Sequence, residues 1–172
     1  QLTVVSRRLA RGYDAERADG RLTWMQFDPA SSSTWADAGL LDALNQADAV
    51  VNLAGEPIAE KRWTATHRQL IETSRLETTS QLVNAIEACT TPPKVLVNAS
   101  AIGFYGSSLD KRFLESSTPG DDFLASLCER WEAAAEAVPP AVRQVTLRIG
   151  IVLAADGGAL GKMLPVFRTG FG

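Results

Sequence analysis

The chain has 172 residues, which suits one domain with a substantial core, and its net charge is −3. That charge balance, with basic residues scattered along the sequence, argues against nucleic acid and anionic membranes as partners. No apolar run approaches the roughly 20 residues that a membrane-spanning helix needs.

Short apolar strands alternate with helical patterns along the whole sequence. The near-continuous apolar run 49–53 predicts a strand buried on both faces, and Thr64 is placed to cap a long helix. Strands separated by helices predict βαβ units, hence an α/β fold with a parallel sheet. In chain order we expect strands at 2–5, 22–28, 49–53 and 94–99 and one starting over 144–147, with helices at 35–46, from 64 to about 89, from 121 or 122 to about 138, and at 159–168.

The sequence lacks metal-binding and redox motifs. The two cysteines, Cys89 and Cys128, have no metal-ligand spacing and form no Cys-x-x-Cys pair, and His67 is the single histidine. We therefore expect no metal site, and we expect His67 on the surface. Both cysteines fall on predicted helices, where buried reduced thiols are expected, and this fits a cytoplasmic protein.

Two successive strands end in small and hydroxyl-bearing residues. The strand at 49–53 runs through Leu53 into Ala54 and Gly55, and the strand at 94–99 runs into Ser100 and, a few residues later, Tyr105. In parallel α/β sheets, ligands bind outside the carboxyl ends of strands, where small residues let the backbone approach. We therefore expect both strand ends to border one crevice that binds a nucleotide cofactor.

Together these patterns resemble a protein family over essentially the whole chain. The family is an atypical group of extended short-chain dehydrogenases/reductases, epimerase-like proteins also described as nucleoside-diphosphate-sugar epimerases or cell-division-inhibitor-like proteins. The segments that carry the resemblance are 52–58 (NLAGEPI), 61–63 (KRW), 74–75 (SR), 100–106 (SAIGFYG), 122–124 (DFL), 131–134 (WEAA), 147–153 (LRIGIVL), 157–160 (GGAL) and 162–164 (KML).

The resemblance implies a Rossmann-like doubly wound parallel sheet that is incomplete at both ends. Residues 1–172 would then form a partial NAD(P)-binding Rossmann-like domain. The family's Gly-rich βα unit would precede Gln1, and further strands and a C-terminal lobe would follow Gly172. A missing first strand would leave a sheet edge uncovered, which invites association, so a homo-oligomer is expected.

The chain departs from the family's usual chemistry at one motif. Classical relatives use Tyr-x-x-x-Lys, in which the lysine lowers the pKa of the tyrosine and orients the ribose. Aligned by the segment 131–134, those two positions hold Leu124 and Cys128. Neither side chain can transfer a proton in that role, so hydride transfer with the usual acid and base is not supported.

The cofactor residues follow from the resemblance. Ser6 and Arg7 come directly after the strand at 2–5, where dinucleotide folds choose between cofactors. An arginine there accommodates the 2′-phosphate of NADP, so NADP is expected over NAD; the alternative is a solvated basic turn. Asp28 would lie beside the adenine in relatives, although Asp-Pro alone is a turn. The turn 53–55 would form the floor of the crevice, or simply a tight turn.

Two residues are candidates for the chemistry. Ser100 lies where relatives place the serine that hydrogen-bonds a substrate oxygen, and a hydroxyl there could polarise that oxygen. Tyr105 is the nearby phenol that could replace the missing acid. The alternatives are a structural serine at a strand end and an aromatic side chain packed in a loop.

Three further residues resemble family positions on the substrate side: Glu56, Arg75 and Lys162. A permanent cation at Arg75 would suit an anionic substrate or the cofactor phosphates. The alternative is an exposed helix arginine paired with Glu72. For Glu56 the alternative is simple packing in its loop, and for Lys162 it is a solvated helix lysine.

Two functions remain open from the sequence. The first is an NADP-dependent oxidoreductase or epimerase acting on a small polar substrate, either free or nucleotide-linked, with Ser100 orienting an oxygen and Tyr105 or water handling the proton. The second is a non-enzymatic NADP-binding module that senses redox state or binds a partner, which the loss of Tyr-x-x-x-Lys favours. One fold hosts many functions, so the resemblance alone does not decide between them.

Overall fold

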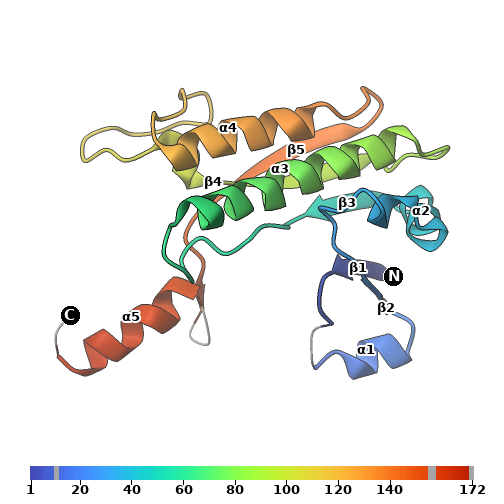
Figure 1. Cartoon of the computed structure of the whole chain (residues 1–172), viewed down its shortest axis with the longest axis horizontal. Helices are drawn as coiled ribbons and strands as arrows, with labels where there is room; N and C mark the ends of the chain where they lie inside the picture. The colour runs from blue at the N-terminus through green and yellow to red at the C-terminus, as the bar shows by residue number, and fades with distance from the viewer. Residues whose placement is uncertain (10–11, 155–157, 171–172) are drawn as a thin grey trace.

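The computed structural model describes residues 1–9, 12–154 and 158–170. Its main strands form two separate parallel sheets, one of two strands and one of three (Figure 1). Every strand pairing is parallel, as the alternating pattern predicts. The first sheet holds β1 (Leu2–Ser6) and β2 (Leu22–Gln26); the second holds β3 (Ala49–Asn52), β4 (Val95–Ala101) and β5 (Arg143–Ile149), in that order, and a short β6 (Leu153–Ala154) follows.

Two long helices, α3 (Ala65–Glu87) and α4 (Phe123–Glu136), lie side by side along the three-stranded sheet (Figure 1). Each begins where a side chain accepts a hydrogen bond from an otherwise unpaired backbone N–H. Thr64 caps α3 and Asp122 caps α4. The remaining helical segments are α1 (Asp14–Ala18), η1 (Thr34–Ala36), α2 (Ala38–Asn45), η2 (Ile102–Tyr105) and α5 (Gly158–Arg168).

The expected helix at 35–46 is divided in the structure. A short 3₁₀ turn, η1, is followed by Asp37 in an extended conformation, and α2 starts only at Ala38. The Asp37 carboxylate accepts a hydrogen bond of 2.9 Å from the backbone N of Leu40, so the residue that interrupts the helical pattern also caps the new helix. The short helix α1 has no buried residue, so its sequence shows no apolar periodicity from which a helix could be predicted.

The hydrophobic core lies between the three-stranded sheet and the two long helices. Ile71, Ile86 and Leu96 are fully buried there, and each such side chain stabilises the fold by about 1.5–3 kcal/mol relative to exposure. The central cluster consists of Leu44, Leu82, Val83, Ala85, Ile86, Leu96, Ala135, Val138 and Val142.

The other face of the three-stranded sheet is open, which corrects the expectation that 49–53 is buried on both faces. Val51 and Leu53 are 59% and 65% exposed, whereas Asn52 between them is buried. Side chains alternate along a strand, so Asn52 points to the helices and its neighbours point away from them. Leu147 and Ile149 of β5 are exposed in the same way. No helix in the described part of the chain covers these side chains.

A buried polar network joins β3, β4, α3 and α4. The Asn52 side-chain amide donates to Asn98 Oδ1 at 2.7 Å and to Thr79 Oγ1 at 3.0 Å, and Trp131 Nε1 donates to the same hydroxyl at 2.9 Å. Asn52 Oδ1 also accepts a hydrogen bond from the backbone N of Ala54. The network therefore fixes the register of two strands and the start of the turn that follows β3.

Candidate functional site

The parallel pairing places the ends of β3, β4 and β5 next to one another. Asn52 pairs with Asn98, and Ser100 pairs with Arg148. The turn 53–55 after β3 and Ser100, the last residue but one of β4, therefore lie at the same edge of the sheet, as expected from the sequence.

Two hollows lie near this edge. The first, about 530 Å³, is lined by Glu115 and the β5 residues 146–149. The second, about 590 Å³, lies along the loop from Tyr105 to Asp121. Neither is lined by residues 53–56, so the two hollows belong to the β4–β5 side of the site.

Ser100 is hydrogen-bonded to the buried carboxylate of an ion pair. Its hydroxyl, at 3% exposure, donates to Glu132 Oε1 at 2.5 Å. The guanidinium of Arg148 donates to both carboxylate oxygens, from Nε at 2.9 Å and from Nη2 at 2.8 Å. This two-pronged, charge-assisted geometry is the strong form of an ion pair. The Ser100 proton is thus engaged with Glu132, and the serine oxygen remains able to accept a hydrogen bond.

Arg148 links the same ion pair to Tyr105. Its Nη1 donates to the Tyr105 hydroxyl oxygen at 2.9 Å and to the backbone oxygen of Glu115 at 2.8 Å. The guanidinium carbon lies 3.5 Å from the ring centroid of Phe104, and the Tyr105 ring stacks on Phe113. Hydrogen bonding to Glu132 raises the pKa of Arg148 above its ordinary value, so this cation is permanent.

The structure thus brings both candidate catalytic residues, Ser100 and Tyr105, into one chain of contacts through Glu132 and Arg148. Our sequence reasoning gave neither of these linking residues a role. One signal was available for Glu132: it lies four residues after Cys128 and three before Ala135, on the apolar stripe of α4. A charge on such a stripe needs a buried partner, and that partner is on a strand far away in sequence.

The two positions that hold Tyr and Lys in classical relatives are packed into the fold. Leu124 lies against Gly103, where an added Cβ would be 3.6 Å from the Leu124 Cβ. Cys128 is buried, and burial raises the pKa of its thiol, so it stays protonated. Neither position supplies an acid or a base. Cys89, expected on a helix, lies just beyond the end of α3 and is half-buried.

Arg7 lies in the turn after β1 and reaches toward the turn after β3. Its Nη2 is 3.5 Å from Glu56 Oε2, and Lys61 Nζ is 3.1 Å from Glu56 Oε1. The Glu56 side chain is only 9% exposed, whereas that of Arg7 is 54% exposed. Lys61 is the largest cause of a pKa of Glu56 below its ordinary value, and Arg7 adds to it. The carboxylate is therefore ionised at neutral pH.

Ser6 and Asp28 form local turns. The Ser6 hydroxyl donates to the backbone oxygen of Arg8 at 2.5 Å and accepts a hydrogen bond from Trp24 Nε1. Asp28 Oδ1 accepts a hydrogen bond from the backbone N of Ala30, and the Asp28 side chain is exposed. Both residues lie at the carboxyl ends of their strands, as the sequence predicts.

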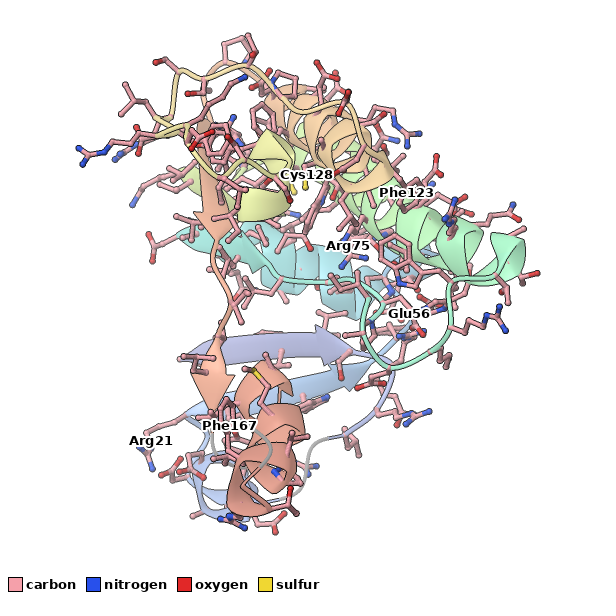
Figure 2. All side chains as sticks on the ribbon, turned by 90° about the vertical axis from the view of Figure 1, so that its left-hand side faces the viewer. Arg21, Glu56, Arg75, Phe123, Cys128 and Phe167 are labelled. Carbon is pink, nitrogen blue, oxygen red and sulfur yellow. The ribbon has the colours of Figure 1, made fainter. Side chains whose placement is uncertain are left out.

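Arg75 lies against the turn after β3, near Glu56 (Figure 2). An added Cβ at Gly55 would be 2.9 Å from the Arg75 guanidinium carbon, so the guanidinium fits there because Gly55 has no side chain. Arg75 Nη1 donates to the backbone oxygens of Glu56 and Ile71. Burial lowers the pKa of Arg75. Its expected alternative partner, Glu72, pairs instead with Arg130.

Two further residues considered in the sequence analysis are His67 and Lys162. His67, expected on the surface, is instead one of the buried side chains of α3 and is only 6% exposed, and its Nε2 has no hydrogen-bond partner among the described residues. Lys162 belongs to α5, but its side chain lies outside the described residues.

The loop between η2 and α4 is closed at its base by two glycines. Gly106 has a φ of +68°, and an added Cβ at Gly120 would lie 2.9 Å from the Gly106 Cα. The Gly120 backbone N donates to the oxygen of Phe104 at 2.8 Å. Because this close approach needs two residues without side chains, the glycines set where the loop leaves and rejoins the site.

Within the described ranges, no three His, Cys, Asp or Glu side chains gather closely enough to hold a metal ion. The helices described are all too short or too polar to span a bilayer. A parallel sheet with helices packed on it and small residues at its strand ends is the arrangement of a Rossmann-like domain, here with helices described on one face of the sheet.

Comparisons with known proteins agree with this class. Residues 2–126 match the NAD dependent epimerase/dehydratase family. The human epimerase family protein SDR39U1 is 39% identical over 175 residues, covering 100% of this chain and 53% of the human protein. The crystal structure of human SDR39U1 (isoform2) with NADPH has a TM-score of 0.74 at 33% identity, covering 99% of this chain and 60% of that one.

The chain therefore belongs to the NAD dependent epimerase/dehydratase family, as the motifs at 52–58 and 100–106 indicate, and it spans about half the length of the relatives it matches. A more distant structure, a double mutant of the dTDP-glucose 4,6-dehydratase DesIV from Streptomyces venezuelae with NAD and DAU bound, has a TM-score of 0.72 at 17% identity. It covers 98% of this chain and 52% of its own, and it shares the fold alone.

Proposed function

We propose that the chain is part of an NADP-binding oxidoreductase or epimerase-like enzyme that acts on a small polar substrate, either free or nucleotide-linked. The observation that carries the proposal is Arg7, a half-exposed guanidinium at the carboxyl end of β1 and close to the turn after β3. A guanidinium at this place in a dinucleotide fold is suited to the 2′-phosphate of NADP. The crystal structure of human SDR39U1 with NADPH supports the same cofactor.

The chain's residues fit a dinucleotide at this edge. Leu53 and Gly55 are exposed, so the backbone of the turn after β3 is accessible, and the charge of Arg7 suits a phosphate. When bound, the cofactor would accept or supply a hydride. Glu56 and Arg75, both next to this turn, are the proposed residues on the substrate side, together with Lys162. We further propose a cytoplasmic location and a homo-oligomer.

Tyr105 is the proposed proton-transfer group. Its oxygen accepts a hydrogen bond from the permanently charged Arg148, which would stabilise the negative charge left when the phenol gives up its proton. Among the described residues, none accepts a hydrogen bond from the Tyr105 hydroxyl, so its proton is free for a substrate oxygen. Ser100, whose proton is held by Glu132, would orient the substrate by accepting a hydrogen bond.

The cofactor assignment is tested by replacing Arg7 with alanine. We expect R7A to bind NADPH about tenfold to a hundredfold more weakly, because a charge-assisted hydrogen bond of the guanidinium is lost. NADH has no 2′-phosphate, so its affinity should not change. Fluorescence titration of both cofactors against the full-length protein measures this. The matched control is R8A, at the exposed arginine next in sequence, and an equal loss in R8A and R7A would refute a specific role of Arg7.

A second candidate function is a non-enzymatic NADP-binding module. The packing of Leu124 and Cys128 at the positions of the usual tyrosine and lysine favours it. The two candidates differ in the Tyr105 hydroxyl. An enzyme should lose at least about a hundredfold in turnover in Y105F, because general acid–base catalysis contributes roughly that much, while its NADPH affinity stays the same.

The measurement is NADPH oxidation with a panel of small polar and nucleotide-linked carbonyl compounds. F113L, which leaves the phenol in place but removes its stacking partner, is the control. Turnover that persists unchanged in Y105F would remove Tyr105 from the mechanism, and NADPH binding without turnover of any compound would favour the module.

A further inference from the structure

Glu56 is held firmly by α3 through its backbone. Its N–H donates to Ser74 Oγ at 2.9 Å, and its carbonyl oxygen accepts a hydrogen bond from Arg75 Nη1 at 3.1 Å. Both backbone groups are thus satisfied by one helix, and the carboxylate, 9% exposed and paired with Lys61, lies beside the turn after β3 (Figure 2). Glu56 is therefore a fixed negative charge at the edge of the site.

Two cations share this carboxylate unequally. Lys61 approaches Oε1 to 3.1 Å, within hydrogen-bond distance, whereas Arg7 stays at 3.5 Å from Oε2. Lys61 is accordingly the main cause of the lowered pKa of Glu56, and Arg7 contributes less. In the described residues the Arg7 side chain has no second ion-pair partner. Arg7 is the weakly held cation of the pair, with much of its guanidinium open to solvent.

We propose that Glu56 competes with the 2′-phosphate of the cofactor for Arg7 and thereby sets how strongly the protein prefers NADPH to NADH. This inference rests on the proposed function, in which Arg7 binds that phosphate, and it assigns Glu56 to the cofactor side of the site in place of the substrate side. A guanidinium makes its best two-pronged contact with one acidic group at a time, so Arg7 must turn from Glu56 toward the phosphate. Lys61 keeps the carboxylate paired after the exchange.

The sign of the effect follows from the charges. Glu56 and the phosphate are both negative, so the carboxylate repels the phosphate as well as occupying its partner. NADH, which has no 2′-phosphate, leaves the Arg7–Glu56 pair intact. Neither the repulsion nor the competition for Arg7 therefore weakens its binding. Glu56 consequently lowers the affinity for NADPH while leaving the affinity for NADH as it is. Because Arg7 is half-exposed, salt should weaken the effect.

The test is a double-mutant cycle on the full-length protein, with NADPH and NADH affinities measured by fluorescence titration. We expect E56Q to bind NADPH about tenfold more tightly, the size of one unit charge acting close to a surface site, and to bind NADH as the parent does. In the R7A background the gain from E56Q should fall to about threefold or less, because the competition for Arg7 is gone.

K61Q is the matched control, because it changes the other cation on the same carboxylate. Without Lys61, Glu56 has Arg7 as its remaining partner and holds it more tightly, so NADPH affinity should fall by about threefold, opposite in sign to E56Q. A merely structural disturbance of the loop would move both variants in the same direction and with both cofactors.

Three results would overturn the inference: weaker NADPH binding by E56Q, an equal change for NADH, or the same gain with and without Arg7. A failure of the proposed function looks different. In that case R7A alone would leave the ratio of NADPH to NADH affinity unchanged, whatever E56Q does.

Discussion

Replacing Arg148 with methionine should lower the free energy of unfolding by about 3–5 kcal/mol. The change removes both donors that neutralise the Glu132 carboxylate, which is only 7% exposed. A buried charge without a partner is costly, whereas the methionine keeps most of the apolar stem of the side chain. Urea denaturation of the variant and the parent, followed by tryptophan fluorescence, measures the difference.

Arg130 provides a matched control for this prediction. It is on α4, like Glu132, and pairs with Glu72, but its side chain is 45% exposed. Arg130→Met should therefore cost less than about 1 kcal/mol, because exposed ion pairs contribute little. The double variant R148M/E132Q should recover part of the loss, since glutamine carries no charge to leave unpaired. Equal losses of unfolding free energy in R148M and R130M would show that the Glu132–Arg148 pair stabilises the fold no more than the exposed Glu72–Arg130 pair does.

Replacing Thr79 with valine should cost about 2–4 kcal/mol of unfolding free energy, because two donors lose their acceptor. The Thr79 hydroxyl is fully buried and accepts hydrogen bonds from Asn52 and Trp131. Valine has the same shape, so the loss would come from unpaired polar groups and not from a cavity. Thermal unfolding followed by circular dichroism provides the measurement.

Thr73→Val is the control for Thr79→Val, since it makes the same substitution on the same helix. Within the part of the chain that the structure describes, the one hydrogen bond of the Thr73 hydroxyl goes to a carbonyl of its own helix, that of Leu70, at 3.5 Å. We expect its loss to stay within about 0.5 kcal/mol, as for most surface substitutions. A Thr79→Val variant as stable as the parent would mean that Asn52 and Trp131 find other acceptors, and that the network does not fix the strand register.

The sequence was most informative where a signal is local. Thr64 caps its helix as predicted, and of the two positions at which the later helix was expected to start, Asp122 is the cap; such signals can be predicted because a cap depends on residues within one turn. The parallel order of the strands and the shared edge of 53–55 and Ser100 also follow from the alternation of elements along the chain. The family match over residues 2–126 agrees with the family that the sequence motifs indicate.

Contacts between distant residues were beyond sequence reasoning. Glu132 and Arg148 lie sixteen positions apart, on a helix and a strand, and no periodicity within either element connects them. The pairing of Arg7 with Glu56 likewise depends on how two separate sheets are placed. The exposure of Val51 was missed for a related reason: an apolar run records the kind of side chain, and not whether another element covers it.

The Asn52 side chain has a consequence for the turn that follows it. Its amide donates to Asn98 and Thr79, and its Oδ1 accepts a hydrogen bond from the backbone N of Ala54. One side chain therefore connects the turn 53–55 to the neighbouring strand and to α3. A ligand held at this turn would stabilise the polar network behind it as well, so binding should also act as a clamp on β3, β4 and α3.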